Sequence, residues 1–151
     1  MASAHKKERR EAWNRFADAG RAVLVGTATV LPQRASRTRV SAGACLLAIK
    51  LMTEVLKKIV PERRPDGEDD ESFPSEHAAA CVAAAMIIER QYPGRIGALA
   101  CALAATVSMA RIESKKHHPR DVAAGALIGW ASVWVTLHLR RTMERRVLSV
   151  A

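Results

Sequence analysis

Aromatic residues are scarce in this chain of 151 residues: they make up 4% of it, although 49% of the residues are hydrophobic. Alanine, valine, leucine and isoleucine supply most of the remaining apolar content. These side chains suit closely packed helices, whereas β-sandwiches favour aromatic and β-branched residues. The composition therefore argues against a β-sandwich and predicts an all-α fold, and the length suits one domain with a real core.

Cysteine is also rare, with three residues that each lie inside an apolar segment: Cys45, Cys81 and Cys101. An odd number of cysteines at wide spacing does not match a disulfide framework, and the spacing does not match a zinc site. We interpret all three as packing residues, so they give no information about the redox compartment. Internal repeats and low-complexity tracts are absent as well.

Acidic residues are outnumbered by basic ones, which gives the chain a net charge of +9. A basic chain is suited to phosphate, nucleic acid or anionic lipid. Many of the cations flank apolar segments, and the sequence lacks both a nucleic-acid-binding motif and basic residues interleaved with aromatic ones. We therefore expect a membrane as the partner of this protein, and no nucleic acid.

The hydrophobic pattern divides the chain into a basic amphipathic segment, residues 1–39, and a core, residues 40–151. Residues 3–20 predict a helix that either lies flat among lipid headgroups or covers the protein surface. The basic start resembles a signal peptide only in part, and we expect it to be retained. Four stronger helical segments are predicted in the core: 40–60, 75–91, 96–112 and 119–141.

The last predicted helix contains 18 consecutive residues without a charge, or about 27 Å of helix, which is enough to cross a membrane. The other helices are shorter or interrupted, so a soluble bundle stays possible. With four crossings, the arginines after residue 139 lie on the same side as the basic N-terminus, as the positive-inside rule expects. The pattern thus favours an integral membrane protein whose loops 61–74 and 113–118 lie together on the non-cytoplasmic face.

These two loops and the adjoining helix ends carry residues suited to a phosphoryl group. Arg64 and Arg111 offer planar forks of donors that match phosphate oxygens, and Lys57 adds a point charge. Ser75, at the start of a helix, adds a hydroxyl and free backbone N–H groups where the helix dipole favours an anion.

Two histidines suggest the chemistry at that site. Asp121 follows His117 by four residues and is expected to hold one ring N–H of that histidine, which leaves the other ring nitrogen as a nucleophile. His77, on the other loop, is expected to face it as a general acid.

Three ordered motifs resemble the signature of the type-2 phosphatidic acid phosphatases, a superfamily that also includes the vanadium haloperoxidases. The first motif is "KKIVPERRP", with Lys57 and Arg64 in place, and the second is "PSEH", which ends at His77. The third, "ARIESKKHHPRD", keeps the spacing of Arg111, His117 and Asp121. The resemblance covers about residues 40–141. Three motifs in the right order are far more specific than any one of them.

The resemblance implies a membrane-embedded helical bundle with a four-helix catalytic core and an added N-terminal helix. It also implies a phosphatase that acts on a lipid phosphate through a phosphohistidine, without a metal or other cofactor, in the bacterial inner membrane. The substrate would be a polyprenyl phosphate or diphosphate, phosphatidylglycerol phosphate, phosphatidic acid or lipid A phosphate. The implied roles are catalytic for His117, His77 and Asp121, and phosphate-binding for Lys57, Arg64, Ser75, Glu76 and Arg111.

Two departures from the family pattern keep alternatives open. Glu76 stands where glycine is usual, and Ala110 replaces serine. The glutamate side chain either turns outward, tunes substrate choice or weakens activity. A degenerate, non-catalytic protein that binds phospholipid or a partner is therefore one alternative, and a vanadium haloperoxidase is another. The oligomeric state cannot be read from the sequence.

Overall fold

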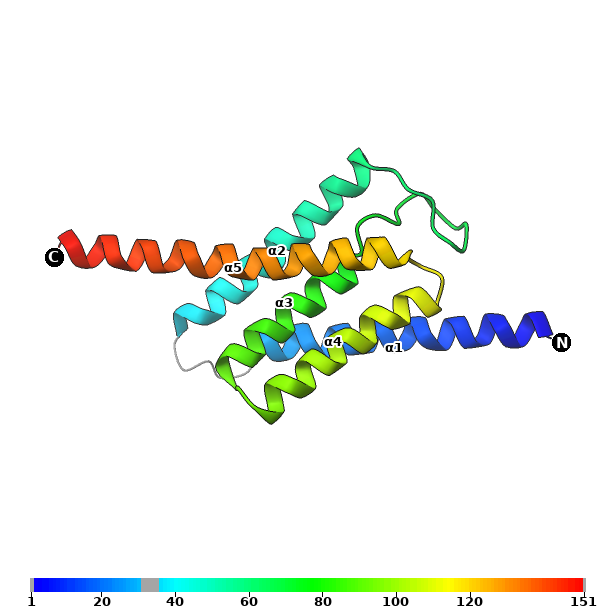
Figure 1. The fold of residues 1–151 in the computed structure, drawn as a ribbon, viewed down its shortest axis with the longest axis horizontal. Helices are drawn as coiled ribbons and strands as arrows, with labels where there is room; N and C mark the ends of the chain where they lie inside the picture. Colours follow the sequence, from blue (N-terminus) through cyan, green and yellow to red (C-terminus); the bar gives the residue numbers. More distant parts are fainter. Residues whose placement is uncertain (1, 31–35, 151) are drawn as a thin grey trace.

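The computed structural model describes residues 2–30 and 36–150, with side-chain burial described over 4–30 and 42–142. All of the regular elements in this part of the chain are helices, which confirms the all-α prediction (Figure 1). Their bounds are α1 Ala2–Val30, α2 Ser36–Ile59, α3 Glu76–Gln91, α4 Arg95–Glu113 and α5 Pro119–Val150.

α2, α3 and α4 begin and end within four residues of their predicted bounds. α5 begins at Pro119 as predicted but continues to Val150, beyond the predicted end at residue 141. α1 is also longer than expected. The predicted helix 3–20 continues without a break through the apolar patch that follows it, up to Val30. One face of α1 is buried because it packs against α3 and α4. The buried side chains on this face include Ala17, Leu24 and Ala28. α1 is therefore a packed layer of the bundle, and residues 31–35 lie outside the described part of the chain.

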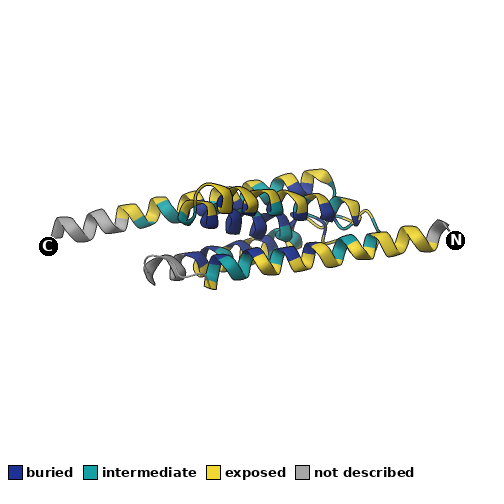
Figure 2. Cartoon of the chain, turned by 90° about the horizontal axis from the view of Figure 1, so that it is seen from below, coloured by how far each residue is buried: buried dark blue, intermediate teal, exposed yellow. Residues whose placement is uncertain are grey.

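α3 occupies the centre of the bundle, where it contacts each of the other four helices (Figure 1). Six of its nine buried side chains are alanine, and these lie between Ala78 and Ala85. Small side chains let the neighbouring helices approach closely, so that the core is filled by backbone and methyl groups. Buried residues face the interior of the bundle, and the outward faces of the helices are exposed (Figure 2).

Two glycines on α5 allow this helix to touch α3. A Cβ atom at Gly125 would lie 2.2 Å from the carbonyl oxygen of Ser75, and one at Gly129 would lie 2.2 Å from that of Ala79. The glycines are four residues apart and therefore share one face of α5. The close approach sets the start of α5 against the start of α3, where the predicted site residues lie.

Replacing Gly129 with alanine is expected to destabilise the fold by about 1–3 kcal/mol, because the added methyl overpacks a backbone contact. Gly26→Ala in α1 is the matched control, since nothing lies within 4 Å of a Cβ there, and it should be neutral or stabilising by up to about 1 kcal/mol. Thermal loss of helicity, followed by circular dichroism, measures both. Equal melting temperatures for Gly129→Ala and the wild type would contradict the close packing of α3 and α5.

Two described helices are long and apolar enough to cross a membrane, namely α4 and the part of α5 from Pro119 to Thr142. α3 has 16 residues and is shorter than such a span, and α2 carries Lys50, Glu54, Lys57 and Lys58. Length and composition thus support a membrane association for two of the four crossings that the sequence suggested.

Candidate active site

The loop between α2 and α3 and the loop between α4 and α5 meet at one end of the bundle, as predicted. The backbone N–H of Asp66 donates to the carbonyl oxygen of Lys115 at 3.0 Å. The N–H of Ser75 donates to the carbonyl oxygen of Asp121, also at 3.0 Å. Residues far apart in the sequence are thereby fixed next to each other through their main chains.

His117 lies in the second loop and is 3% exposed. Its ring nitrogen Nδ1 lies 2.6 Å from the carbonyl oxygen of Ser72. A carbonyl oxygen only accepts, so Nδ1 carries the hydrogen in this contact and Nε2 is the nitrogen with the lone pair. The ring is thus held in the tautomer that a nucleophile at Nε2 requires.

This contact corrects one expectation, because the group that holds the ring of His117 is Ser72 and not Asp121. The fully buried carboxylate of Asp121 accepts from the Ser72 hydroxyl at 2.5 Å and from the His118 N–H at 2.9 Å. His118 precedes the first residue of α5, and a carboxylate three residues later is well placed to cap its N–H. Asp121 therefore supports His117 indirectly, by fixing Ser72.

The environment keeps the ring of His117 neutral. The pKa of His117 is lowered to about 3, mainly by burial and next by the charge of Arg111, while the hydrogen bond with Ser72 opposes the shift. Protonation of a buried imidazole next to a guanidinium costs more free energy than protonation of an exposed one. At neutral pH the unprotonated, nucleophilic form of the ring is the one present.

Arg111 lies at the end of α4 and is 5% exposed. Its Nη1 donates to the side-chain oxygen of Asn14 in α1 and lies 3.9 Å from an oxygen of Asp18. Its Nε has no hydrogen-bond partner among the described residues, although it is buried. A buried cationic donor without a partner is costly, so this nitrogen is suited to an anion that binds beside it.

The other two predicted phosphate-binding cations each have a carboxylate partner from the acidic run, residues 66–71. Lys57 Nζ lies 3.7 Å from Glu71 Oε2, and Arg64 Nε lies 2.7 Å from Asp69 Oδ1. Lys57 also lies 3.7 Å from Glu54 in its own helix. The acidic run thus supplies counter-charges to the cations of the site.

A further ion pair ties the two loops together. Lys116 Nζ lies 3.0 Å from Asp66 Oδ2 and also contacts Glu68. Burial alone lowers the pKa of Lys116, but the hydrogen bonds and charges of Glu68 and Asp66 outweigh it and raise the pKa. Lys116 therefore stays charged and holds the acidic run against the loop that carries His117.

The second motif opens α3 as predicted, with Ser75 as the N-cap. The Ser75 hydroxyl is buried and accepts from the Ala78 N–H at 3.5 Å. The next two side chains turn toward α1. Glu76 Oε1 lies 2.8 Å from Arg21 Nη2, and His77 Nε2 lies 2.8 Å from Asp18 Oδ1.

Sequence reasoning missed four residues of this site: Ser72, Asn14, Asp18 and Arg21. Ser72 stands two residues before the "PSEH" motif, and its burial is what distinguishes it from an ordinary loop serine. The three residues of α1 are spaced by four and three, so they share one face of the helix. That polar stripe was the available signal, and it runs beside the buried apolar face of α1.

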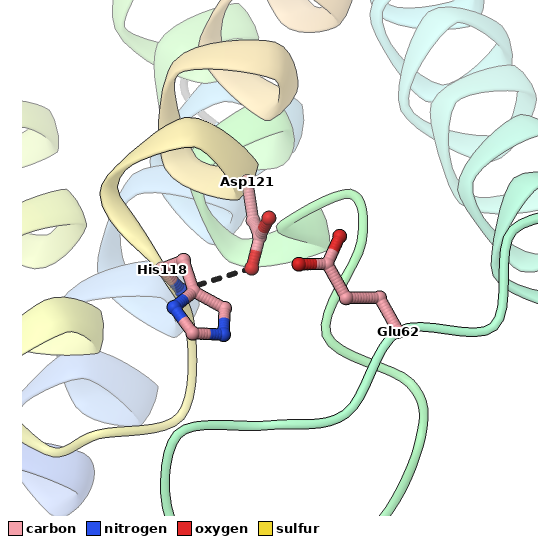
Figure 3. Close-up of side chains that lie close together, drawn as sticks. All are labelled: Glu62, His118 and Asp121. Atoms are coloured by element: carbon pink, nitrogen blue, oxygen red, sulfur yellow. Dashed lines mark hydrogen bonds between the residues drawn. The ribbon is translucent and has the colours of Figure 1, made fainter.

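Glu62, His118 and Asp121 each offer a ligand atom within 4.8 Å of the others, the spacing of a metal site (Figure 3). The positively charged side chain of Arg120 already lies at these carboxylates. The guanidinium of Arg120 contacts Glu62 Oε1, and its Nε lies 3.8 Å from Asp121 Oδ1. Ion pairing with Arg120 thus accounts for this cluster, and we assign no metal to it.

Comparison with known families gives a match to the PAP2 superfamily over residues 38–145. The matched region contains all three motifs, both loops and α3, α4 and most of α5, whereas α1 precedes it. Searches of curated proteins and of solved structures gave no match to this chain.

Proposed function

Because the chain belongs to the PAP2 superfamily, whose members are generally phosphatases, we propose that it hydrolyses a lipid phosphate through a phosphohistidine formed on His117. The observation that carries this proposal is the state of that residue. Its ring is buried and neutral, and its Nδ1 is held by Ser72, so that Nε2 has the lone pair. The buried Nε of Arg111 supplies a donor for the phosphate.

The reaction follows from these positions in two steps. His117 Nε2 attacks phosphorus, a nitrogen–phosphorus bond forms, and the bond to the leaving oxygen breaks while His77 gives that oxygen a proton. His77 then takes a proton from water, whose oxygen attacks phosphorus while the nitrogen–phosphorus bond to His117 breaks, and inorganic phosphate is released. Asp121 acts through Ser72 to keep the ring of His117 in place.

The basic residues hold the phosphate oxygens through both steps. Arg111 and Arg64 provide planar donors and Lys57 a point charge, and Ser75 adds the start of α3, where the helix dipole favours an anion. When phosphate binds, it replaces the carboxylates of Asp69 and Glu71 as the counter-charge of Arg64 and Lys57. Transition-state stabilisation by fixed charges of this kind is the largest contribution in many phosphoryl transfers.

Two hollows beside the site support a lipid substrate. One, of about 290 Å³, is lined by His77, Asp18 and other residues of α1. The second, of about 280 Å³, lies between α1, α2 and α3, and its apolar lining residues are Val25, Leu46, Leu47, Ile49 and Ala80. The two hollows share Arg21 and Val25 in their linings. An apolar chain attached to a phosphate at His77 can lie against these apolar residues, beside the charged Arg21, Lys50 and Glu76 of the same lining.

The outward faces of the helices support insertion in a membrane. On α2, four large apolar side chains spaced by one turn are between 54% and 68% exposed: Leu47, Leu51, Val55 and Ile59. α4 and α5 expose further large apolar side chains, among them Leu99, Met109, Leu127, Trp130 and Leu139. Contiguous apolar surface of this kind indicates contact with lipid or protein. We place the protein in the bacterial inner membrane, with the site on the non-cytoplasmic side.

Glu76 bears on the non-catalytic alternative. Its carboxylate is paired with Arg21 and thus has a counter-charge, so that its negative charge beside the anion site is compensated. This pairing favours an active enzyme with an altered second motif over a degenerate one.

Phosphate release from a panel of substrates tests the proposal. Polyprenyl phosphate and diphosphate, phosphatidic acid and phosphatidylglycerol phosphate are offered to the purified protein in detergent, and glycerol phosphate serves as the soluble comparison. We expect at least one lipid to exceed glycerol phosphate by about 10²-fold or more in kcat/KM, because remote binding energy contributes to catalysis. A chelator should leave the rate unchanged. Absence of release from every substrate, or a preference for glycerol phosphate, would refute the proposal.

A further inference from the structure

The polar stripe of α1, formed by Asn14, Asp18 and Arg21, contacts residues of two of the three motifs. Asn14 accepts from Arg111, Asp18 contacts His77, and Arg21 pairs with Glu76. The buried apolar face of α1 lies directly beside the stripe, and its Ala17 is fully buried. α1 precedes the region that matches the family, so the family pattern assigns no role to these residues.

We propose that Asp18 is a positioning residue of the active site, which fixes the orientation of the His77 ring and favours the form of that ring that can act as the acid. This inference rests on the proposed phosphatase function, because that function gives His77 the role of acid. Asp18 itself is not required to touch the substrate.

The geometry of the contact is that of a charge-assisted hydrogen bond. Asp18 Oδ1 lies 2.8 Å from His77 Nε2, and the same oxygen lies 3.9 Å from Nη1 of Arg111. An ionised carboxylate only accepts, so Nε2 carries the hydrogen in this contact. The remaining ring nitrogen, Nδ1, is then the one that exchanges a proton with the substrate.

Electrostatics gives this carboxylate a second role. The charged groups that face His77 are Asp18 and Arg21 on α1 and Arg111 on α4. His77 lies at the end of the bundle, before the apolar segment of α3 begins. The pKa of His77 is lowered to about 4, mainly by burial and also by the charges of Arg111 and Arg21, whereas Asp18 opposes this shift. An acid must hold a proton before it gives one away. Among the charged groups named above, Asp18 favours the protonated ring. A bound phosphate adds negative charge and raises the pKa further.

The same contacts suit a second arrangement, in which Asp18 occupies the place of a phosphate oxygen and blocks the empty site. The two arrangements predict opposite effects of removing the charge. A positioning residue is needed for turnover, whereas a blocking residue competes with the substrate. The experiment below therefore separates them.

Asp18→Asn is made in the full chain and compared with Glu8→Gln, which removes the same charge from an exposed position of the same helix. We expect kcat on a lipid phosphate to fall by about 10- to 100-fold, in the range of general acid catalysis, with KM changed by less than about twofold. The alkaline limb of the kcat profile should move to lower pH. Asp18→Glu, which keeps the carboxylate, should restore most of the turnover, and Glu8→Gln should match the wild type.

A titration of the His77 ring by NMR provides a readout that needs no activity. The pKa of His77 should be lower in Asp18→Asn than in the wild type or in Glu8→Gln. If Asp18→Asn fails to fold, Asp18→Ala takes its place in both measurements. An unchanged pKa of His77, an unchanged kcat, or a lower KM with a higher kcat would overturn the proposal. A wild type without phosphatase activity would refute the proposed function instead, and the titration would still decide whether Asp18 holds His77.

Discussion

His117→Ala is expected to lower the turnover of a lipid phosphate by at least about 10³-fold, because removal of a nucleophile leaves only binding and electrostatic stabilisation. The ring is buried and bonded to Ser72, so the loss should appear in kcat. Phosphate release from the substrate panel measures it. The melting temperature of His117→Ala should stay close to that of the wild type, which would show that the variant is folded.

The matched control for this variant is His118→Ala, which removes the adjacent ring. The His118 side chain contacts the carbonyl oxygen of Arg63 at 3.3 Å, and no step of the proposed reaction uses that ring. We expect His118→Ala to keep activity within about tenfold of the wild type, because a substitution away from the reacting atoms usually has a small effect. If both variants lost activity equally, or if His117→Ala retained full turnover, the assignment of the nucleophile would be wrong.

The pH dependence of wild-type activity is an independent test of the neutral state of the His117 ring. Because the pKa of His117 lies at about 3, protonation removes the nucleophile only in strongly acidic solution. Any loss of activity between pH 5 and 7 must therefore come from another group. A pH profile of kcat/KM for the wild type measures this, and the acidic limb that belongs to His117 should have its midpoint near pH 3.

Arg111→Lys is expected to lower kcat/KM by about 10²- to 10³-fold, the loss typical of removing one donor that stabilises developing charge. Lysine keeps the charge but loses the planar fork and the buried Nε, which has no partner among the described residues. Steady-state kinetics on the preferred lipid phosphate measures the effect.

Arg95→Lys is the matched control, because Arg95 is exposed at the opposite end of the same helix. It should leave kcat/KM within about twofold of the wild type. Equal activity of the Arg111 and Arg95 variants would show that the guanidinium of Arg111 does not bind the phosphate.

Much of the fold could be predicted, because hydrophobic periodicity and helix-start residues act locally. Pro119 begins α5 and Ser75 caps α3, where the sequence placed them. The length of α1 was underestimated, because its apolar second half was considered separately from its basic first half. A change in composition along a helix does not end it when no proline or capping residue intervenes.

The site could be predicted only in part, since motif spacing shows which residues come together but not how their side chains pair. His117 and Asp121 were expected to bond directly, whereas a helix cap at His118 draws the carboxylate away and Ser72 bridges the two. The partners of His77 and Arg111 come from α1, about sixty to a hundred residues earlier. No local pattern in the sequence links positions so far apart.

The most direct measurement of the central claim is capture of the phosphorylated intermediate. Radiolabelled lipid phosphate is mixed with the enzyme, the reaction is quenched in alkali, and the labelled peptide is identified. The account predicts a label that is stable to alkali and lost in acid, as a nitrogen–phosphorus bond is, on the peptide that contains His117. Label on another residue of an active enzyme, or in His117→Ala as much as in the wild type, would contradict it.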